Sequence, residues 1–143
     1  MSLTAVSNPP VRSAAKRRVL VAEDDPAIRR MMVAALRADG VEVDEVADGA
    51  ALIEQLASLL LRSGRRDGYD LLVVDLRMPR MDGLQVLAGL RRGGWRAPVV
   101  VVTADPHPGT CERAVRLGAR AVFRKPFDLD DFRTAVTHFS RAA

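Results

Sequence analysis

The sequence predicts an α/β domain built on a five-stranded parallel sheet with helices on both faces. Two observations support this prediction. Continuous apolar runs at Leu71–Val74 and Pro98–Thr103 are typical of strands that are buried on both faces, as in parallel sheets. Strand-like segments also alternate with amphipathic helical segments five times along the chain. Right-handed crossovers between such units give a doubly wound (βα)5 sheet that is covered on both sides.

Bulk composition indicates one soluble domain. The 143 residues are 48% hydrophobic and 28% charged, which is ordinary for a globular protein large enough to form a core. No apolar run approaches the roughly 20 residues of a membrane span, and the N-terminus lacks the apolar core of a signal peptide. We therefore expect a cytoplasmic protein without membrane contact. The single Cys111 cannot form an internal disulfide, which agrees with a reducing compartment.

The net charge of +4 is compatible with binding to nucleic acid. However, the basic residues are scattered along predicted helices and loops, and no stretch interleaves them with aromatic residues as in single-strand binders. We therefore expect no direct nucleic-acid binding by this segment. Lys16 and Lys125 are the only lysines among 22 basic residues, so a lysine within the folded region attracts interest.

The first strand and helix follow a basic tail. Residues 1–17 lack periodicity and are predicted to be a disordered basic tail that precedes a domain at residues 18–141. Arg18–Glu23 is an apolar strand that ends in acidic residues. Asp25 is then expected to cap a helix that begins at Pro26, and Gly40 is expected to end that helix.

The second and third units surround the central strand. Val41–Val46 alternates apolar and acidic residues, which indicates an edge strand. A helix with an apolar face of leucines follows, and the basic loop Arg62–Gly68 leads into the run Leu71–Val74. After a loop, Asp82–Gly83 is expected to begin a helix that Gly93–Gly94 closes.

The last two units complete the sheet. Asp105–Gly109 contains two prolines and is predicted to be a loop, followed by a short helix at Cys111–Leu117. Ala119–Arg124 contains the last strand, and Asp128 is expected to cap the final helix. Five such units favour the flavodoxin-like strand order 2-1-3-4-5, in which ligands bind where strands 1 and 3 diverge at their carboxyl ends.

Chemically active side chains follow four of the five predicted strands. Each of them comes directly after an apolar run, so we expect them to meet at one edge of the sheet: Glu23 and Asp24, Asp75, Thr103, and Lys125. Carboxylates that converge need a cation, and Mg²⁺ suits them because it takes oxygen ligands and is often shared with phosphate. A hydroxyl and an ammonium would complete a site for phosphoryl transfer onto the carboxylate of Asp75.

The chain resembles the receiver domain of two-component response regulators. Four segments carry this resemblance, in the family's order and at the right strand ends: VLVAEDD, VVDLRMPRMDG, VVVVTA and RKPF. The resemblance covers Arg18 to about Arg141. It implies that Asp75 is the phosphoacceptor and that Thr103 and Lys125 hold the phosphoryl group. It also implies a cis peptide bond between Lys125 and Pro126.

The resemblance further implies a metal and several partners. Asp24, Asp75 and the backbone carbonyl of Arg77 would bind Mg²⁺ directly, Glu23 would bind it through water, and Mn²⁺ would substitute. A sensor histidine kinase or a histidine phosphotransfer protein would donate the phosphoryl group. Phosphorylation would change the face formed by the fourth helix, the last strand and the final helix, for an unknown downstream effector or for a homodimer.

Three features depart from the family pattern. Val122 stands where the family has an aromatic residue that swings inward, and Phe123 is expected to point to the opposite face of the sheet. The spacing between Asp24 and Asp75 is longer than usual, and we assign the excess to the loop Arg62–Gly68. Arg77 and Asp105 occupy positions that tune phosphoryl loss, and a salt bridge between them would hinder an attacking water.

Two other functions are weighed against this one. A protein that keeps the fold but acts as a phosphorylation-independent interaction module would have no need of the complete set of site residues. An Asp-nucleophile phosphohydrolase would need a second aspartate two residues after the nucleophile, and this position is Arg77. We therefore expect a signalling domain that transfers a phosphoryl group only to itself, and not an enzyme that turns over a metabolite.

Overall fold

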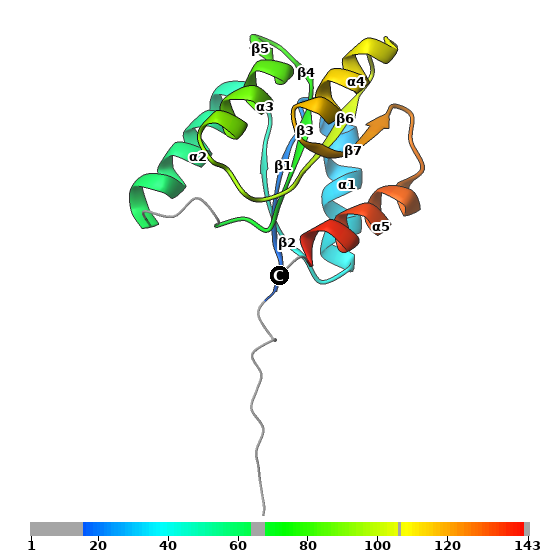
Figure 1. Ribbon diagram of the computed structural model, residues 1–143. Helices are drawn as coiled ribbons and strands as arrows, with labels where there is room; N and C mark the ends of the chain where they lie inside the picture. Colours follow the sequence, from blue (N-terminus) through cyan, green and yellow to red (C-terminus); the bar gives the residue numbers. More distant parts are fainter. Residues whose placement is uncertain (1–15, 64–67, 106, 142–143) are drawn as a thin grey trace, which may run out of the picture.

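A computed structural model describes residues 16–63, 68–105 and 107–141 of the chain (Figure 1). Five strands form one parallel sheet in the order β2-β1-β3-β6-β7, which confirms the predicted order 2-1-3-4-5. Their bounds are Arg18–Ala22 for β1, Glu42–Val46 for β2, Leu71–Asp75 for β3, Val99–Thr103 for β6 and Ala119–Arg124 for β7. Most of the predicted tail lies outside the described residues.

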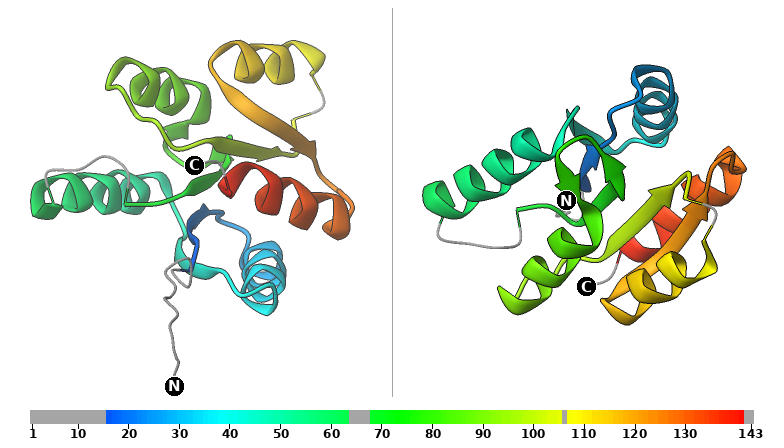
Figure 2. Two further views of the ribbon diagram at one scale, coloured as in Figure 1. Left: turned by 60° about the horizontal axis from the view of Figure 1, so that its bottom comes forward. Right: turned by 90° about the horizontal axis from the view of Figure 1, so that it is seen from above.

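Five helices cover the two faces of this sheet, as Figure 2 shows. They are α1 at Pro26–Ala38, α2 at Gly49–Ser63, α3 at Gly83–Arg92, α4 at Pro108–Arg116 and α5 at Leu129–Ser140. The apolar residues of α1 and α5 pack in one cluster, and those of α2, α3 and α4 pack in a second cluster on the other face. Within the described residues, no helix is both long and apolar enough to cross a bilayer.

The three central strands, β1, β3 and β6, position the candidate site because apolar clusters pack on both of their faces. Every residue of β3 and β6 is buried, and successive residues of β1 contribute alternately to the two clusters, such as Val19 to one and Leu20 to the other. Burial of each such side chain contributes roughly 1.5–3 kcal/mol. The carboxyl ends of these strands are therefore held rigidly beside one another.

Three helices, α1, α3 and α5, begin directly after aspartates that the sequence placed at helix starts. The carboxylate of Asp25 accepts hydrogen bonds from the amides of Ala27 and Ile28 at 2.9 and 3.2 Å. Asp82 and Asp128 cap α3 and α5 in the same way. Gly40 has a φ of 84°, a left-handed conformation that suits glycine after a helix, as expected at the end of α1.

Two local predictions were wrong. The helix predicted at Cys111–Leu117 already begins at Pro108 within the predicted loop, because proline is well tolerated in the first turn of a helix. The loop after Asp75 contains a short antiparallel hairpin of β4 at Arg77–Met78 and β5 at Met81–Asp82. Most of the predicted basic loop at 62–68 falls on residues 64–67, which lie outside the described residues.

Candidate functional site

Three carboxylates meet where β1 and β3 end. Glu23, Asp24 and Asp75 each offer an oxygen atom, and these atoms all lie within 4.8 Å of one another. Glu23 is fully buried and Asp75 is 2% exposed, whereas Asp24 is partly exposed. A cleft of about 660 Å³ opens above them, lined by residues that include Asp24, Asp75, Arg77 and Lys125. The expected convergence at one edge of the sheet is therefore present.

Lys125 lies between two of these carboxylates. Its ammonium donates a hydrogen bond to Asp75 Oδ2 at 3.0 Å and lies 2.7 Å from Glu23 Oε1. The buried Oε1 atom has no hydrogen bond of good geometry, so its contact with Lys125 is one of charge. The peptide bond between Lys125 and Pro126 is cis, as the resemblance implied.

The hairpin after Asp75 fixes the second oxygen of its carboxylate. The amide of Arg77 donates to Asp75 Oδ1 at 2.9 Å, while the Arg77 side chain is exposed. Gly83 allows this tight return of the chain, because a Cβ atom there would lie 2.5 Å from the Cα atom of Leu76. Asp75 is therefore oriented by backbone contacts as well as by Lys125.

Thr103 ends the neighbouring strand and is fully buried. Its hydroxyl oxygen accepts a hydrogen bond from the amide of Asp105 at 3.0 Å. Its carbonyl accepts a hydrogen bond from the amide of Lys125 at 2.8 Å, so the backbone aligns both residues at the same end of the sheet. The hydroxyl proton of Thr103 is not used in this hydrogen bond, so the hydroxyl can still donate to another acceptor.

Burial and charge shift the protonation of the cluster. Burial is the main cause that raises the pKa of Glu23 to about 7, the neighbouring Asp75 raises it further, and Lys125 opposes the shift. Burial also lowers the pKa of Lys125, but its contacts with Glu23 and Asp75 outweigh this effect and the net shift is upward. Three crowded carboxylates, two of them buried, are suited to a hard divalent cation.

Residues 19–137 match the family model described as the response regulator receiver domain. The chain belongs to this receiver domain family. It is 36% identical over 124 residues to the response regulator protein PmrA of Pseudomonas aeruginosa, covering 87% of this chain and 52% of the relative. It is 38% identical over 125 residues to the transcriptional regulatory protein PdtaR of Mycobacterium tuberculosis, covering 87% of this chain and 57% of the relative.

The solved structures agree with this assignment. The signal receiver domain of the response regulator NarL from Mycobacterium tuberculosis has a TM-score of 0.73 and 30% identity, covering 90% of this chain and 98% of that chain. The receiver domain described here spans about half the length of the curated relatives PmrA and PdtaR.

Val122 and Phe123 lie on opposite faces of the sheet, as the sequence predicted. Val122 packs with the cluster below α2, α3 and α4, whereas Phe123 packs with the cluster on the opposite face. The ring centroids of Phe123, Phe127 and Phe132 lie 5.5 to 5.9 Å apart in one aromatic group beside α5. Phe123 is therefore held by neighbours on the side of the sheet away from Val122.

The hypothesis of a salt bridge between Arg77 and Asp105 has no support in the geometry. No ion pair joins these two side chains in the described part of the chain. Asp105 instead accepts hydrogen bonds from the amide of His107 at 2.9 Å and from the hydroxyl of Thr110 at 3.0 Å. The sequence did not indicate Thr110 as a partner of Asp105. The early start of α4 at Pro108 brings the Thr110 hydroxyl to the Asp105 carboxylate.

The raised pKa of Glu23 predicts that the metal-free receiver domain becomes less stable as pH rises. The folded protein holds this proton more tightly than the unfolded chain, for which the pKa is 4.5. The associated stability is fully present below pH 4.5 and is lost as pH rises to about 7, which amounts to roughly 3 kcal/mol. Urea unfolding in EDTA between pH 5 and 8 measures this loss.

A Glu23→Gln variant is the matched control for this measurement, because it keeps the shape of the side chain and removes its titration. The difference in unfolding free energy between this variant and the natural chain should grow in the variant's favour as pH rises. A difference that stays constant between pH 5 and 8 would contradict the assignment.

Proposed function

We propose that this receiver domain accepts a phosphoryl group on Asp75 in a Mg²⁺-dependent reaction, from a sensor histidine kinase or a histidine phosphotransfer protein. The observation that carries the proposal is the placement of Lys125, whose ammonium contacts the buried carboxylates of Asp75 and Glu23 beside Asp24. This arrangement combines a nucleophile, a cation and a set of metal ligands in a single open cleft.

The reaction is a direct displacement at phosphorus. An oxygen of the Asp75 carboxylate forms a bond to phosphorus as the bond between phosphorus and a ring nitrogen of the donor histidine breaks. The donor nitrogen keeps the electron pair of the broken bond, and the product on this chain is an acyl phosphate. Lys125 already lies 3.0 Å from Asp75 Oδ2, so its charge can balance the phosphoryl oxygens.

The residues that would hold the metal are those of the carboxylate cluster. Asp24, Asp75 and the backbone carbonyl of Arg77 would bind Mg²⁺ or Mn²⁺ directly, and Glu23 would bind through water. When bound, the ion neutralises the negative charge that gathers on the transferred phosphoryl group. The amide of Arg77 meanwhile orients the Asp75 carboxylate by its hydrogen bond to Oδ1.

The signal would leave through the face built by α4, β7 and α5. Thr103 connects the site to this face, because its hydroxyl accepts from Asp105 and Asp105 accepts from Thr110 on α4. A Thr103 hydroxyl that turns toward the phosphoryl group would weaken this chain of contacts. We propose that an effector or a second copy binds this face, and that switching does not use Phe123.

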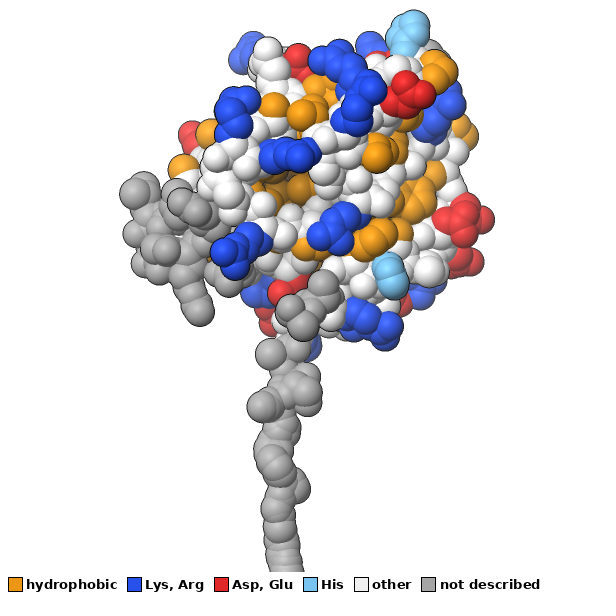
Figure 3. Space-filling view, in the orientation of Figure 1, with side chains coloured by type: hydrophobic (Ala, Val, Ile, Leu, Met, Phe, Trp, Pro, Cys, Tyr) orange, Lys and Arg blue, Asp and Glu red, His pale blue; other side chains and the backbone are white. Residues whose placement is uncertain are grey.

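This function is that of a cytoplasmic switch that does not turn over an external substrate and does not itself bind nucleic acid. Figure 3 shows several Lys and Arg side chains on the visible face, with hydrophobic and uncharged surface between most of them. Incubation with Mg²⁺ and acetyl phosphate, followed by intact mass measurement, tests the proposal. A gain of about 80 Da supports it, inertness supports an interaction module, and continued hydrolysis of phosphate esters supports a phosphohydrolase.

An Arg77→Ala variant is expected to lose its phosphoryl group roughly threefold faster than the natural chain. The Arg77 side chain is exposed at the cleft over Asp75, where its length and charge obstruct an attacking water. The decay of the phosphorylated mass after removal of acetyl phosphate measures this rate.

Arg92→Ala is the matched control, because Arg92 is an exposed arginine at the end of α3 that does not line this cleft. Its rate of phosphoryl loss should equal that of the natural chain. Unchanged or slower loss in Arg77→Ala would refute a protective role for Arg77.

A further inference from the structure

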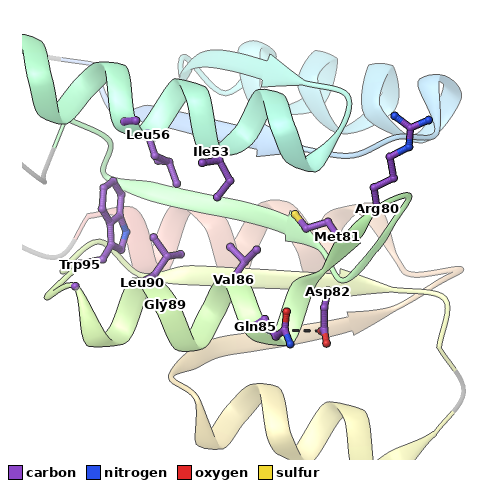
Figure 4. A pocket seen from close by; sticks show the side chains of 12 residues that line it. Ile53, Leu56, Arg80, Met81, Asp82, Gln85, Val86, Gly89, Leu90 and Trp95 are labelled. Carbon is purple, nitrogen blue, oxygen red and sulfur yellow. Dashed lines mark hydrogen bonds between the residues drawn. The ribbon is translucent and has the colours of Figure 1, made fainter.

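A second cavity of about 510 Å³ lies between α2 and α3, on the other side of the β4–β5 hairpin from α4. Figure 4 shows Ile53 and Leu56 of α2 facing Val86 and Leu90 of α3 across it. Ile53 is 51% exposed, although it is a large apolar residue that would gain by burial. The walls are therefore apolar and incompletely covered.

Each end of this cavity carries a hydrogen-bond donor without a partner. At one end the indole nitrogen of Trp95 is buried and donates to no acceptor. At the other end Arg80 is exposed, and no hydrogen bond or ion pair of its guanidinium is found among the described residues. Figure 4 shows the two side chains at opposite ends of the cavity, with the guanidinium of Arg80 directed away from the apolar walls. Because water does not reach the buried indole nitrogen of Trp95, Arg80 is the one of these two donors that an occupant of the cavity can contact.

The acidic residue at the rim does not offset these donors. Asp82 lines the same cavity, but its Oδ1 atom caps α3 by accepting from the amides of Leu84 and Gln85 at 3.0 and 3.4 Å. Its charge is therefore directed at the start of the helix. Among the described lining residues, the unpaired cationic group that an occupant can reach is therefore the guanidinium of Arg80 at the rim.

We propose that this cavity binds a small organic anion with an apolar body, of the class of medium-chain or aromatic carboxylates. The apolar body would lie between Leu56 and Val86, and its carboxylate would pair at the rim with Arg80, whose exposed side chain would turn toward it. The cavity volume lies within the range of roughly 300–1,000 Å³ that is typical of small-molecule sites, and the mixture of apolar walls with a few polar groups is equally typical. This site is separate from the carboxylate cluster and does not depend on the proposed phosphorylation.

The position of the cavity connects it to the phosphoacceptor loop. Arg80 and Met81 belong to the turn and second strand of the hairpin that begins two residues after Asp75. Figure 4 shows the Met81 side chain pointing into the cavity from this hairpin. Gly49 of α2 is tightly packed on Met81, since a Cβ atom there would lie 2.5 Å from its sulfur. An occupant would therefore touch the segment that orients Asp75.

The chain contains its own probe for this site, because Trp95 is its only tryptophan. Titration of the purified 143-residue chain with decanoate should shift the Trp95 emission in a saturable manner. Decanol, which has the same chain without the charge, should bind roughly tenfold more weakly. Benzoate and naphthoate titrations distinguish an aromatic from an alkyl preference within the same class.

Three variants test the assignment. Val86→Phe fills the cavity and should weaken decanoate binding at least about tenfold. Val115→Phe makes the same change on α4 at a residue that is 56% exposed and outside the cavity, and should leave binding unchanged. Arg80→Gln should bring decanoate binding to the level of decanol, while decanol binding stays the same.

Several results would overturn the proposal. One is an emission that does not respond to any of the carboxylates, and another is equal binding of decanoate by Val86→Phe and Val115→Phe. Equal affinity for decanoate and decanol in the natural chain would reject an anion site. Sedimentation that shows a dimer dissociated by Val86→Phe but not by Val115→Phe would mean that a second copy fills the cavity instead.

Discussion

An Asp75→Asn variant is expected to gain no phosphoryl group when it is incubated with Mg²⁺ and acetyl phosphate. The amide of asparagine is neutral and far less nucleophilic than a carboxylate, so the bond to phosphorus cannot form. Asp75 is also the only one of the three clustered carboxylates that Lys125 and the Arg77 amide both contact. Its two oxygens are therefore oriented for attack, and the loss of the mass increase of about 80 Da should be complete.

Asp82→Asn is the matched control for this prediction. It makes the same chemical change in the same hairpin, and asparagine caps a helix about as well as aspartate does. This variant should reach the phosphorylated mass of the natural chain. If Asp75→Asn still gained about 80 Da, the phosphoacceptor would be another residue, and peptide mapping after trypsin digestion would locate it.

The fold could be predicted because its strongest signals are periodic and local. The run Leu71–Val74 is apolar at every position, and such a run fits a strand buried on both faces. The aspartate caps at Asp25, Asp82 and Asp128 act on amides two or three residues away, so they also could be identified from sequence alone. The hairpin at Arg77–Asp82 was missed because two strands of two residues have no periodicity.

The site was predicted less completely than the fold. Topology alone places Glu23, Asp75 and Lys125 at neighbouring strand ends, so their meeting could be inferred from the order of strands. Side-chain partners could not, because they depend on rotamers and on where helices begin. Asp105 shows this limit, since its partner Thr110 became available only through the early start of α4 at Pro108.

The hairpin after Asp75 contributes residues to both cavities. Arg77 lines the cleft over the carboxylates, and Arg80 lines the apolar cavity between α2 and α3. Both arginines belong to one hairpin, in which Arg77 lies in β4 and Arg80 lies in the turn. Arg80 has a φ of 63°, a left-handed conformation that is uncommon for residues with a side chain. An occupant of the proposed anion site would therefore contact the same hairpin whose Arg77 amide donates a hydrogen bond to Asp75.

A Lys125→Met variant is expected to lose about 3 kcal/mol of unfolding free energy at pH 8 in the absence of metal. The Lys125 side chain is only 13% exposed and contacts Glu23 and Asp75, which are both buried. Removal of its charge leaves these carboxylates to repel each other without compensation. The loss should be smaller at pH 5, where Glu23 is protonated because its pKa is about 7. Urea unfolding of both chains at the two pH values measures this difference.

The same variant should also be phosphorylated at least about tenfold more slowly, because the phosphoryl oxygens lose their balancing cation. Lys125→Arg keeps a charge but replaces the compact ammonium by a planar guanidinium, so it should retain more stability than Lys125→Met. Arg113→Met removes an exposed cation of α4 and should change the unfolding free energy by less than about 0.5 kcal/mol. If Lys125→Met lost the same unfolding free energy at pH 8 as at pH 5, Lys125 would not hold the two buried carboxylates together.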